Sequence, residues 1–157
     1  MKPRMNASNP VPGVCNNTAL RKAARHVTRF YDTCLADTGL RGTQYAILNL
    51  VATRGPSTIA DLAETLVMDR ATMGHNLRPL ERDGLIAIRV GQRDRREREV
   101  TLTDEGMALE AEGKLAWNRA QKQFETLFGK EDALAMRRVM ARIAALDLQD
   151  NDATERR

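Results

Sequence analysis

The spacing of apolar residues predicts that most of this chain is helical. From about residue 17 to residue 148, apolar positions recur at steps of three and four residues, as on a helix with one buried face. The first long stripe ends at Thr38 and Gly39, and two later ones begin after Thr103 and Gly129. The members of these three stripes are Leu20, Ala23, Ala24, Val27, Phe30, Tyr31, Cys34 and Leu35, then Met107, Ala111, Leu115, Ala120, Phe124 and Leu127, then Leu134, Val139, Met140, Ile143 and Leu146.

Three shorter helices are predicted between the first long stripe and Gly84. Thr43, Thr58 and Asp69 are each placed to cap one of them, because their side-chain oxygens accept hydrogen bonds from the first helical turn. Pro79 lies inside the third and is expected to bend it. The three helices cover residues 43–54, 58–66 and 70–83, and their core-facing residues are Ile47, Leu48, Leu50, Val51, Ile59, Leu62, Ala63, Leu66, Met73, Leu77 and Leu80.

After Gly84 the apolar pattern changes to the two-residue period of a β-strand. Residues 85–90 and 98–102 read as two strands, and the charged residues 91–97 read as the turn between them. The expected fold is therefore mainly α, of the α+β kind, with six helices and a two-stranded hairpin. A length of 157 residues fits one structural domain.

Residue counts argue against an enzyme. The chain has two His and two Cys, which do not lie at the spacing of a zinc site, and neither Ser8 nor Ser57 lies in a G-x-S-x-G turn. Phosphate-loop and dinucleotide-binding glycine motifs are missing, so no metal and no cofactor are expected. We also expect a cytoplasmic protein without membrane contact, because the chain has no signal-peptide pattern and no apolar run of about 18 residues.

The charge distribution favours an acidic partner. The chain carries 25 Lys+Arg against 21 Asp+Glu, a net charge of +4. Five arginines in the hairpin, against Asp94 and Glu97, give ten residues a net charge of +3. Like charges repel unless a polyanion neutralises them, and nucleic acid is the commonest such partner. Aromatic residues make up only 4% of the chain, which argues against a stacking surface for single strands.

Residues 58–66 and 70–83 have the order and turn length of a helix-turn-helix. In that motif the second helix lies in the major groove, where polar side chains reach the edges of the bases. Asparagine can form two hydrogen bonds with adenine and arginine can form two with guanine. The outward-facing polar residues of the second helix are Arg70, Thr72, His75, Asn76, Arg78 and Arg82.

The central third of the chain resembles the winged helix-turn-helix core of the MarR (multiple antibiotic resistance regulator) family of transcription factors. The close match covers residues 43–106, and the flanking helices agree in order and length. The matching pieces are Gln44-Tyr45, Leu62-Ala63, Asp69-Arg70-Ala71-Thr72, the LERDGLI run at 80–86, Asp94-x-Arg96 and Leu102-Thr103-x-x-Gly106.

The resemblance implies a homodimeric regulator, usually a repressor, on a pseudo-palindromic operator. Residues 17–42 and 107–148 would form the dimerisation helices, with a flexible arm at 1–16 and a flexible tail at 149–157. Asp94 would brace the wing and Arg96 would enter the minor groove, while Ser57 and Thr58 would contact phosphates at a helix N-terminus. The residues assigned to DNA contact are Ser57, Thr58, Arg70, Thr72, His75, Asn76, Arg78, Arg93, Asp94, Arg95, Arg96 and Arg98.

The resemblance also implies release from DNA by a small, often aromatic, effector. A pocket where the dimer base meets the DNA-binding lobes would hold it. A carboxylate or phenolate effector would need a cation such as Arg25 or Arg29 beside an apolar wall. The candidate effector residues are Arg25, His26, Arg29, Tyr31, Met107 and Trp117.

Three alternatives remain open from the sequence. Some relatives sense oxidants through a cysteine at the start of the first helix, and Cys15 lies two residues before that position, which Asn17 occupies. A protein-interaction or architectural module that reads no specific DNA sequence is the second alternative. A small enzyme using Cys15 or His26 is the third, although no nucleophile, base and orienting group are suitably spaced.

Overall fold

The computed structural model describes residues 15–91 and 94–147, and within them it contains the six expected helices. The helical elements are α1 (Asn16–Leu35), the short 3-10 helix η1 (Ala36–Thr38), α2 (Gly42–Arg54), α3 (Ile59–Thr65), α4 (Arg70–Arg82), α5 (Asp104–Phe128) and α6 (Lys130–Ala144). The first helix begins one residue earlier than predicted, and α4 continues through Pro79. Most of the expected arm, all of the expected tail, and Arg93 lie outside the described residues.

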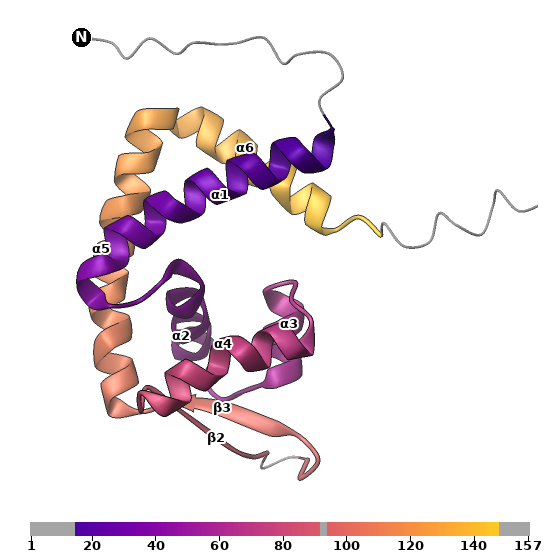
Figure 1. Ribbon diagram of the computed structural model, residues 1–157, viewed down its shortest axis with the longest axis vertical. Helices are drawn as coiled ribbons and strands as arrows, with labels where there is room; N and C mark the ends of the chain where they lie inside the picture. The colour runs from indigo at the N-terminus through magenta and orange to yellow at the C-terminus, as the bar shows by residue number, and fades with distance from the viewer. Residues whose placement is uncertain (1–14, 92–93, 148–157) are drawn as a thin grey trace, which may run out of the picture.

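The elements form a DNA-binding lobe and a helical base at opposite ends of the molecule (Figure 1). The lobe comprises α2, α3, α4 and a small sheet. The base comprises α1, α6 and the second half of α5. Helix α5 runs along one side from the sheet to the base, so it joins the two parts.

The predicted helix caps are confirmed at three positions and wrong at one. Thr58, Asp69 and Thr103 accept hydrogen bonds from the backbone N–H groups of the third helical residue, at 3.0, 2.8 and 3.0 Å. Thr43 does not cap α2, which begins one residue earlier, at Gly42. Gln44 instead accepts the backbone N–H of Arg41 at 2.9 Å, so a longer polar side chain closes this helix start.

The hairpin belongs to a three-stranded antiparallel sheet, where two strands were predicted. Strand β3 (Arg98–Leu102) pairs with β2 (Ile86–Val90) on one side and with β1 (Ser57–Thr58) on the other. The sequence did not reveal β1 because its two polar residues show no apolar alternation. Its pairing fixes the start of α3 against the base of the wing, which matters for the site below.

The hydrophobic core lies in the lobe, where α2, α3, α4, the sheet and the first half of α5 meet. Its fully buried large side chains are Leu35, Ile47, Leu48, Leu62, Met73, Leu77, Leu80 and Val100. Gly113 lets α5 approach α2 closely, since a Cβ there would lie 2.7 Å from the Tyr45 ring. The inward faces predicted for α3 and α4 are confirmed.

The apolar stripes of α5 and α6 are largely exposed in the single chain. The buried positions of α5 are mostly small residues such as Ala116 and Ala120, and α6 buries only Ala133. The exposed large residues of these two helices are Met107, Leu115, Leu127, Phe128, Leu134, Val139 and Met140. No described helix combines the length and the apolar character needed to cross a membrane.

Candidate nucleic-acid interface

Helix α4 presents a polar face to solvent because its apolar residues are used in the core. Met73, Leu77 and Leu80 are at most 1% exposed, which fixes the rotation of the helix. The outward side chains are therefore those predicted for base contact. Arg70, Thr72, His75 and Arg78 are exposed, and Asn76 is half-buried.

Local hydrogen bonds divide the outward residues of α4 into occupied and free groups. The Thr72 hydroxyl donates to Asp69 at 2.7 Å, and Asn76 Nδ2 donates to the Thr72 carbonyl at 2.8 Å. The hydrogen bonds from Thr72 lower the pKa of the Asp69 carboxyl. Arg82 is paired with Asp83 at 2.8 Å, whereas no ion pair is recorded within 4 Å of Arg70 or Arg78.

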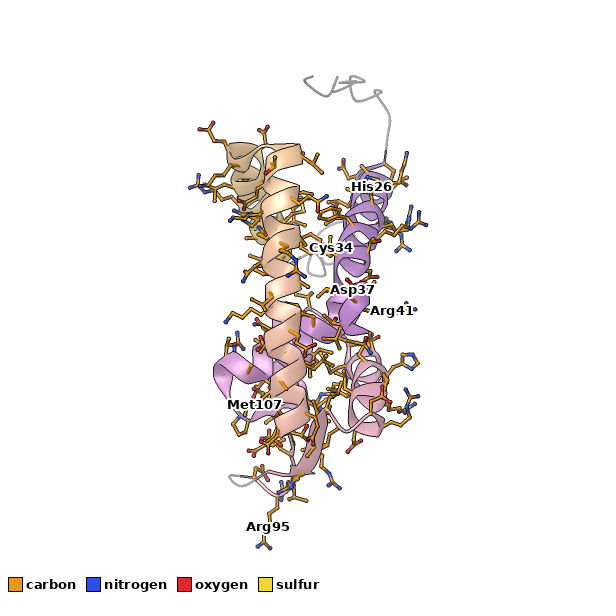
Figure 2. The ribbon with its side chains drawn as sticks, turned by 90° about the vertical axis from the view of Figure 1, so that its left-hand side faces the viewer. His26, Cys34, Asp37, Arg41, Arg95 and Met107 are labelled. Carbon is orange, nitrogen blue, oxygen red and sulfur yellow. The ribbon has the colours of Figure 1, made fainter. Side chains whose placement is uncertain are left out.

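The described part of the wing turn is held together by backbone and carboxylate contacts. Asp94 accepts the backbone N–H of Arg96 at 2.8 Å, and its carbonyl accepts that of Glu97 at 3.1 Å. Gly91 donates to the Glu97 carbonyl at 2.9 Å, and a Cβ on Gly91 would come within 2.7 Å of the Asp94 carbonyl oxygen. The turn therefore requires glycine there. It projects Arg95 beyond the body of the lobe (Figure 2).

Ser57 and Thr58 both lie where β1 leads into α3, but their side chains differ in accessibility. Ser57 is 7% exposed, and its hydroxyl donates to the Gly55 carbonyl at 3.0 Å, so it is turned into the protein. Thr58 is half-buried and caps α3.

A hollow of about 260 Å³ brings the recognition helix and the wing together. It is lined by Thr58, Ile59, Ala60, Arg70, Arg96, Glu97 and Arg98. The sequence placed the arginines on separate elements and gave no contact between them. The β1–β3 pairing, in which Thr58 lies opposite Glu99, is what brings them to one place.

A second cavity, of about 620 Å³, lies between α1, α2, α5 and the turn that links α3 to α4. Of the predicted effector residues, Tyr31 and Trp117 line it, while Arg25, His26, Arg29 and Met107 are exposed and do not. Figure 2 shows His26 and Met107 near opposite ends of the molecule. Lys114 is the cation that lines this cavity, and the apolar periodicity of α5 gave no reason to select it.

Several cavity side chains are already hydrogen-bonded or stacked. The Tyr31 hydroxyl donates to Gln121 at 2.6 Å, and Asn49 donates to the buried Glu110 at 2.9 Å. Burial, and secondarily Glu125, raises the pKa of Tyr31. The rings of Tyr45 and Trp117 stack with centroids 6.3 Å apart and form an aromatic wall.

The two cysteines are free thiols in different surroundings. Cys15 is exposed immediately before α1, and hydrogen bonds from Thr18 and Asn17 lower its pKa. Cys34 is half-buried on the apolar stripe of α1. In the part of the chain that the structure describes, no group of three or more His, Cys, Asp or Glu side chains could hold a metal ion.

Comparison with known proteins agrees with this geometry. The sequence model of the MarR family matches residues 38–97. The HTH-type transcriptional regulator PetP of Rhodobacter capsulatus is 42% identical over 55 residues, or 35% of this chain and 33% of PetP. The chain therefore matches about a third of the length of that curated relative.

Two solved structures extend the likeness to nearly the whole described fold. The M. tuberculosis transcriptional regulator MosR, in complex with DNA, has a TM-score of 0.75 and 30% identity over 83% of this chain and 94% of MosR. The transcriptional repressor CouR, bound to a 23-mer DNA duplex, has a TM-score of 0.74 and 27% identity over 83% of this chain and 92% of CouR. The chain belongs to the MarR family of DNA-binding transcriptional regulators.

Proposed function

We propose that this protein is a sequence-specific repressor that binds a pseudo-palindromic operator as a homodimer. One observation carries the proposal: the polar face of α4 and the arginines of the wing lie at one end of the molecule, while exposed apolar residues gather on the base. Each end then has a matching partner, which is duplex DNA for one and a second copy of the chain for the other.

The DNA-binding end fits one half of an operator. The major groove, about 12 Å wide, admits a single helix, and α4 would present Thr72, His75, Asn76 and Arg78 to the bases. The wing beside it would place Arg95 and Arg96 in the narrower minor groove. The DNA complexes of MosR and CouR support this mode of binding.

The base has the exposed apolar surface expected of a dimer interface. Leu127 is 61% exposed and Leu134 is 43% exposed, although both lie on amphipathic helices. A soluble protein rarely leaves such a cluster uncovered. The same residues on a second copy, related by a two-fold axis, would cover them and make residues 17–42 and 107–148 the dimerisation helices.

The test begins with selection of bound duplexes from a random pool by the purified protein. Fluorescence anisotropy with the selected duplex and a scrambled duplex should give affinities that differ by about 10³ or more. Both affinities should fall steeply with salt. Light scattering should give the mass of a dimer. Equal affinity for the two duplexes, or a monomer at micromolar concentration, would contradict the proposal.

We further propose that the 620 Å³ cavity holds the effector. Its aromatic wall and the Lys114 ammonium suit a small aromatic acid, whose carboxylate would pair with that cation. Tyr31 and Trp117 stay in the proposed site, and Lys114 takes the role first assigned to Arg25 or Arg29. Adding aromatic acids one at a time to the protein–duplex complex should identify a member that lowers the anisotropy. The Lys114→Met variant should respond more weakly to it.

Oxidant sensing through Cys15 is a second candidate, and the lowered pKa of its exposed thiol favours it. Hydrogen peroxide would then release wild-type protein from the duplex but not the Cys15→Ser variant. A variant that is released as readily as the wild type would exclude this mechanism.

A further inference from the structure

The hollow between α3, α4 and the wing contains an unbalanced set of charges. Arg70, Arg96 and Arg98 line it together with the single acid Glu97. Within residues 15–91 and 94–147 the recorded ion pairs are Arg82–Asp83 and Arg137–Glu125, so none involves these four side chains. Three guanidinium groups therefore share one small space without a neutralising carboxylate in contact.

We propose that this hollow is a seat for one DNA backbone phosphate, held by Arg70 and Arg98, and that Glu97 weakens the binding. A guanidinium group fits a phosphate with two parallel hydrogen bonds, and a phosphodiester carries the single negative charge that the seat lacks. The inference rests on the proposed operator binding. It also changes the role of Arg70 from reading bases to positioning the recognition helix.

The local backbone supports a fixed seat. Arg70 is the first residue of α4, directly after the Asp69 cap, and Arg98 is the first residue of β3. Both chain segments are held by hydrogen bonds, one through the cap and one through the sheet. Arg96 lies between the seat and the tip of the wing, so it can still serve the minor groove.

Glu97 gives the proposal its most distinctive consequence. A carboxylate in a phosphate seat repels the same backbone that the arginines attract, and partial screening leaves an effect of about three- to tenfold in affinity. The Glu97→Gln variant should therefore bind every duplex more tightly, by about this factor. Because phosphates carry no sequence information, the ratio of operator to scrambled affinity should stay unchanged.

The experiment measures anisotropy of the full-length protein with the selected duplex and a scrambled duplex at several salt concentrations. Arg70→Gln and Arg98→Gln should weaken both duplexes by the same factor and reduce the salt slope by about 0.9 for each seat lost. Glu112→Gln, an exposed change of equal charge on α5, is the control and should leave affinity nearly unchanged. Thermal melts verify that each variant is folded.

Distinct outcomes separate the seat from operator binding as a whole. If Arg70→Gln lowers operator affinity and spares the scrambled duplex, Arg70 reads bases and the seat is refuted. The seat is also refuted if Glu97→Gln has no more effect than Glu112→Gln. A wild-type protein that shows no salt-dependent duplex binding would instead remove the operator proposal. Inorganic phosphate, tested against chloride at equal ionic strength, should compete weakly with DNA. Strong competition would assign the hollow to a free phosphate compound.

Discussion

The DNA-binding lobe and the helical base have similar apolar periodicity in sequence but bury it very differently. In the lobe, Ile47, Leu48 and Met73 are completely buried by other elements of the same chain. In the base, Leu127 is 61% exposed and Leu134 is 43% exposed. An amphipathic stripe therefore predicts a helix and its apolar face, but it does not tell whether the same chain covers that face.

The helices of the base are held to one another by aromatic and polar contacts. Phe30, Tyr31, Phe124 and Phe128 form a ring cluster with neighbouring centroids 5.4–6.3 Å apart. A hydrogen-bonded chain runs from Tyr31 on α1 through Gln121 and Glu125 on α5 to Arg137 on α6. These contacts fix the helix arrangement and leave much of the apolar surface for a partner.

The largest expected effect comes from truncating the core of the lobe. Leu48→Ala removes a fully buried side chain, and loss of its packing plus the remaining cavity should lower the free energy of unfolding by about 2–5 kcal/mol. Urea denaturation measures this. Leu134→Ala in the base is the matched change, and its loss should grow with protein concentration, because only a second copy would bury it. Equal losses at all concentrations would show that the two regions do not differ.

The next effect separates DNA binding from stability. Arg96→Ala removes an exposed wing side chain whose backbone N–H, held by Asp94, is retained. We expect a loss of about 2–3 kcal/mol in operator binding and an unchanged melting temperature. The control is Arg138→Ala on the exposed surface of α6, which should leave binding unchanged. An unaltered affinity of Arg96→Ala would remove the wing from the interface.

Local sequence signals predicted the elements of the lobe well, because caps and periodicity act over a few residues. Thr58, Asp69 and Thr103 cap their helices as expected, and Met73, Leu77 and Leu80 face the core. Strand β1 was missed, since its two residues pair only because β3 lies beside them. That pairing is a long-range contact and has no local pattern.

The candidate sites were less predictable than the elements. The wing and the recognition helix were selected from their residue types, but the hollow that joins Arg70 to Arg98 depends on the folded sheet. Lys114 was missed because Glu110, one turn earlier, bonds Asn49 and not the lysine, so no charge pattern marked it. Arg25 and Arg29 were selected for charge alone, and the rotation of α1 keeps both exposed and away from the cavity.

A smaller effect is expected for Asn76, which tests whether the outward face of α4 reads bases. Its Nδ2 donates to the Thr72 carbonyl, which leaves a second N–H and the amide oxygen for an adenine. Asn76→Ala should reduce discrimination between the selected operator and single-base variants by about 1–3 kcal/mol. Binding to the scrambled duplex should stay nearly constant. Equal losses on both duplexes would assign Asn76 to helix packing.

The smallest effect concerns two helix ends with the same hydrogen-bond pattern and different residues. After α3, Val67 N–H donates to the Glu64 carbonyl and Met68 N–H to the Ala63 carbonyl, and Gly84 and Leu85 repeat this pattern after α4. Val67 has φ +51° and Gly84 has φ +73°, so a β-branched residue occupies a left-handed position that suits glycine.

Val67 is 76% exposed, so replacing it sacrifices little packing. Val67→Gly should relieve backbone strain of about 1–2 kcal/mol, and part of that gain is offset by the greater freedom of glycine in the unfolded chain. We expect a net stabilisation of about 0.5–1 kcal/mol in urea denaturation. Gly84→Ala, where a Cβ meets nothing within 4 Å, should destabilise by about 1 kcal/mol through backbone strain alone. A Val67→Gly variant that loses stability would mean that the valine side chain contributes contacts that outweigh its strain.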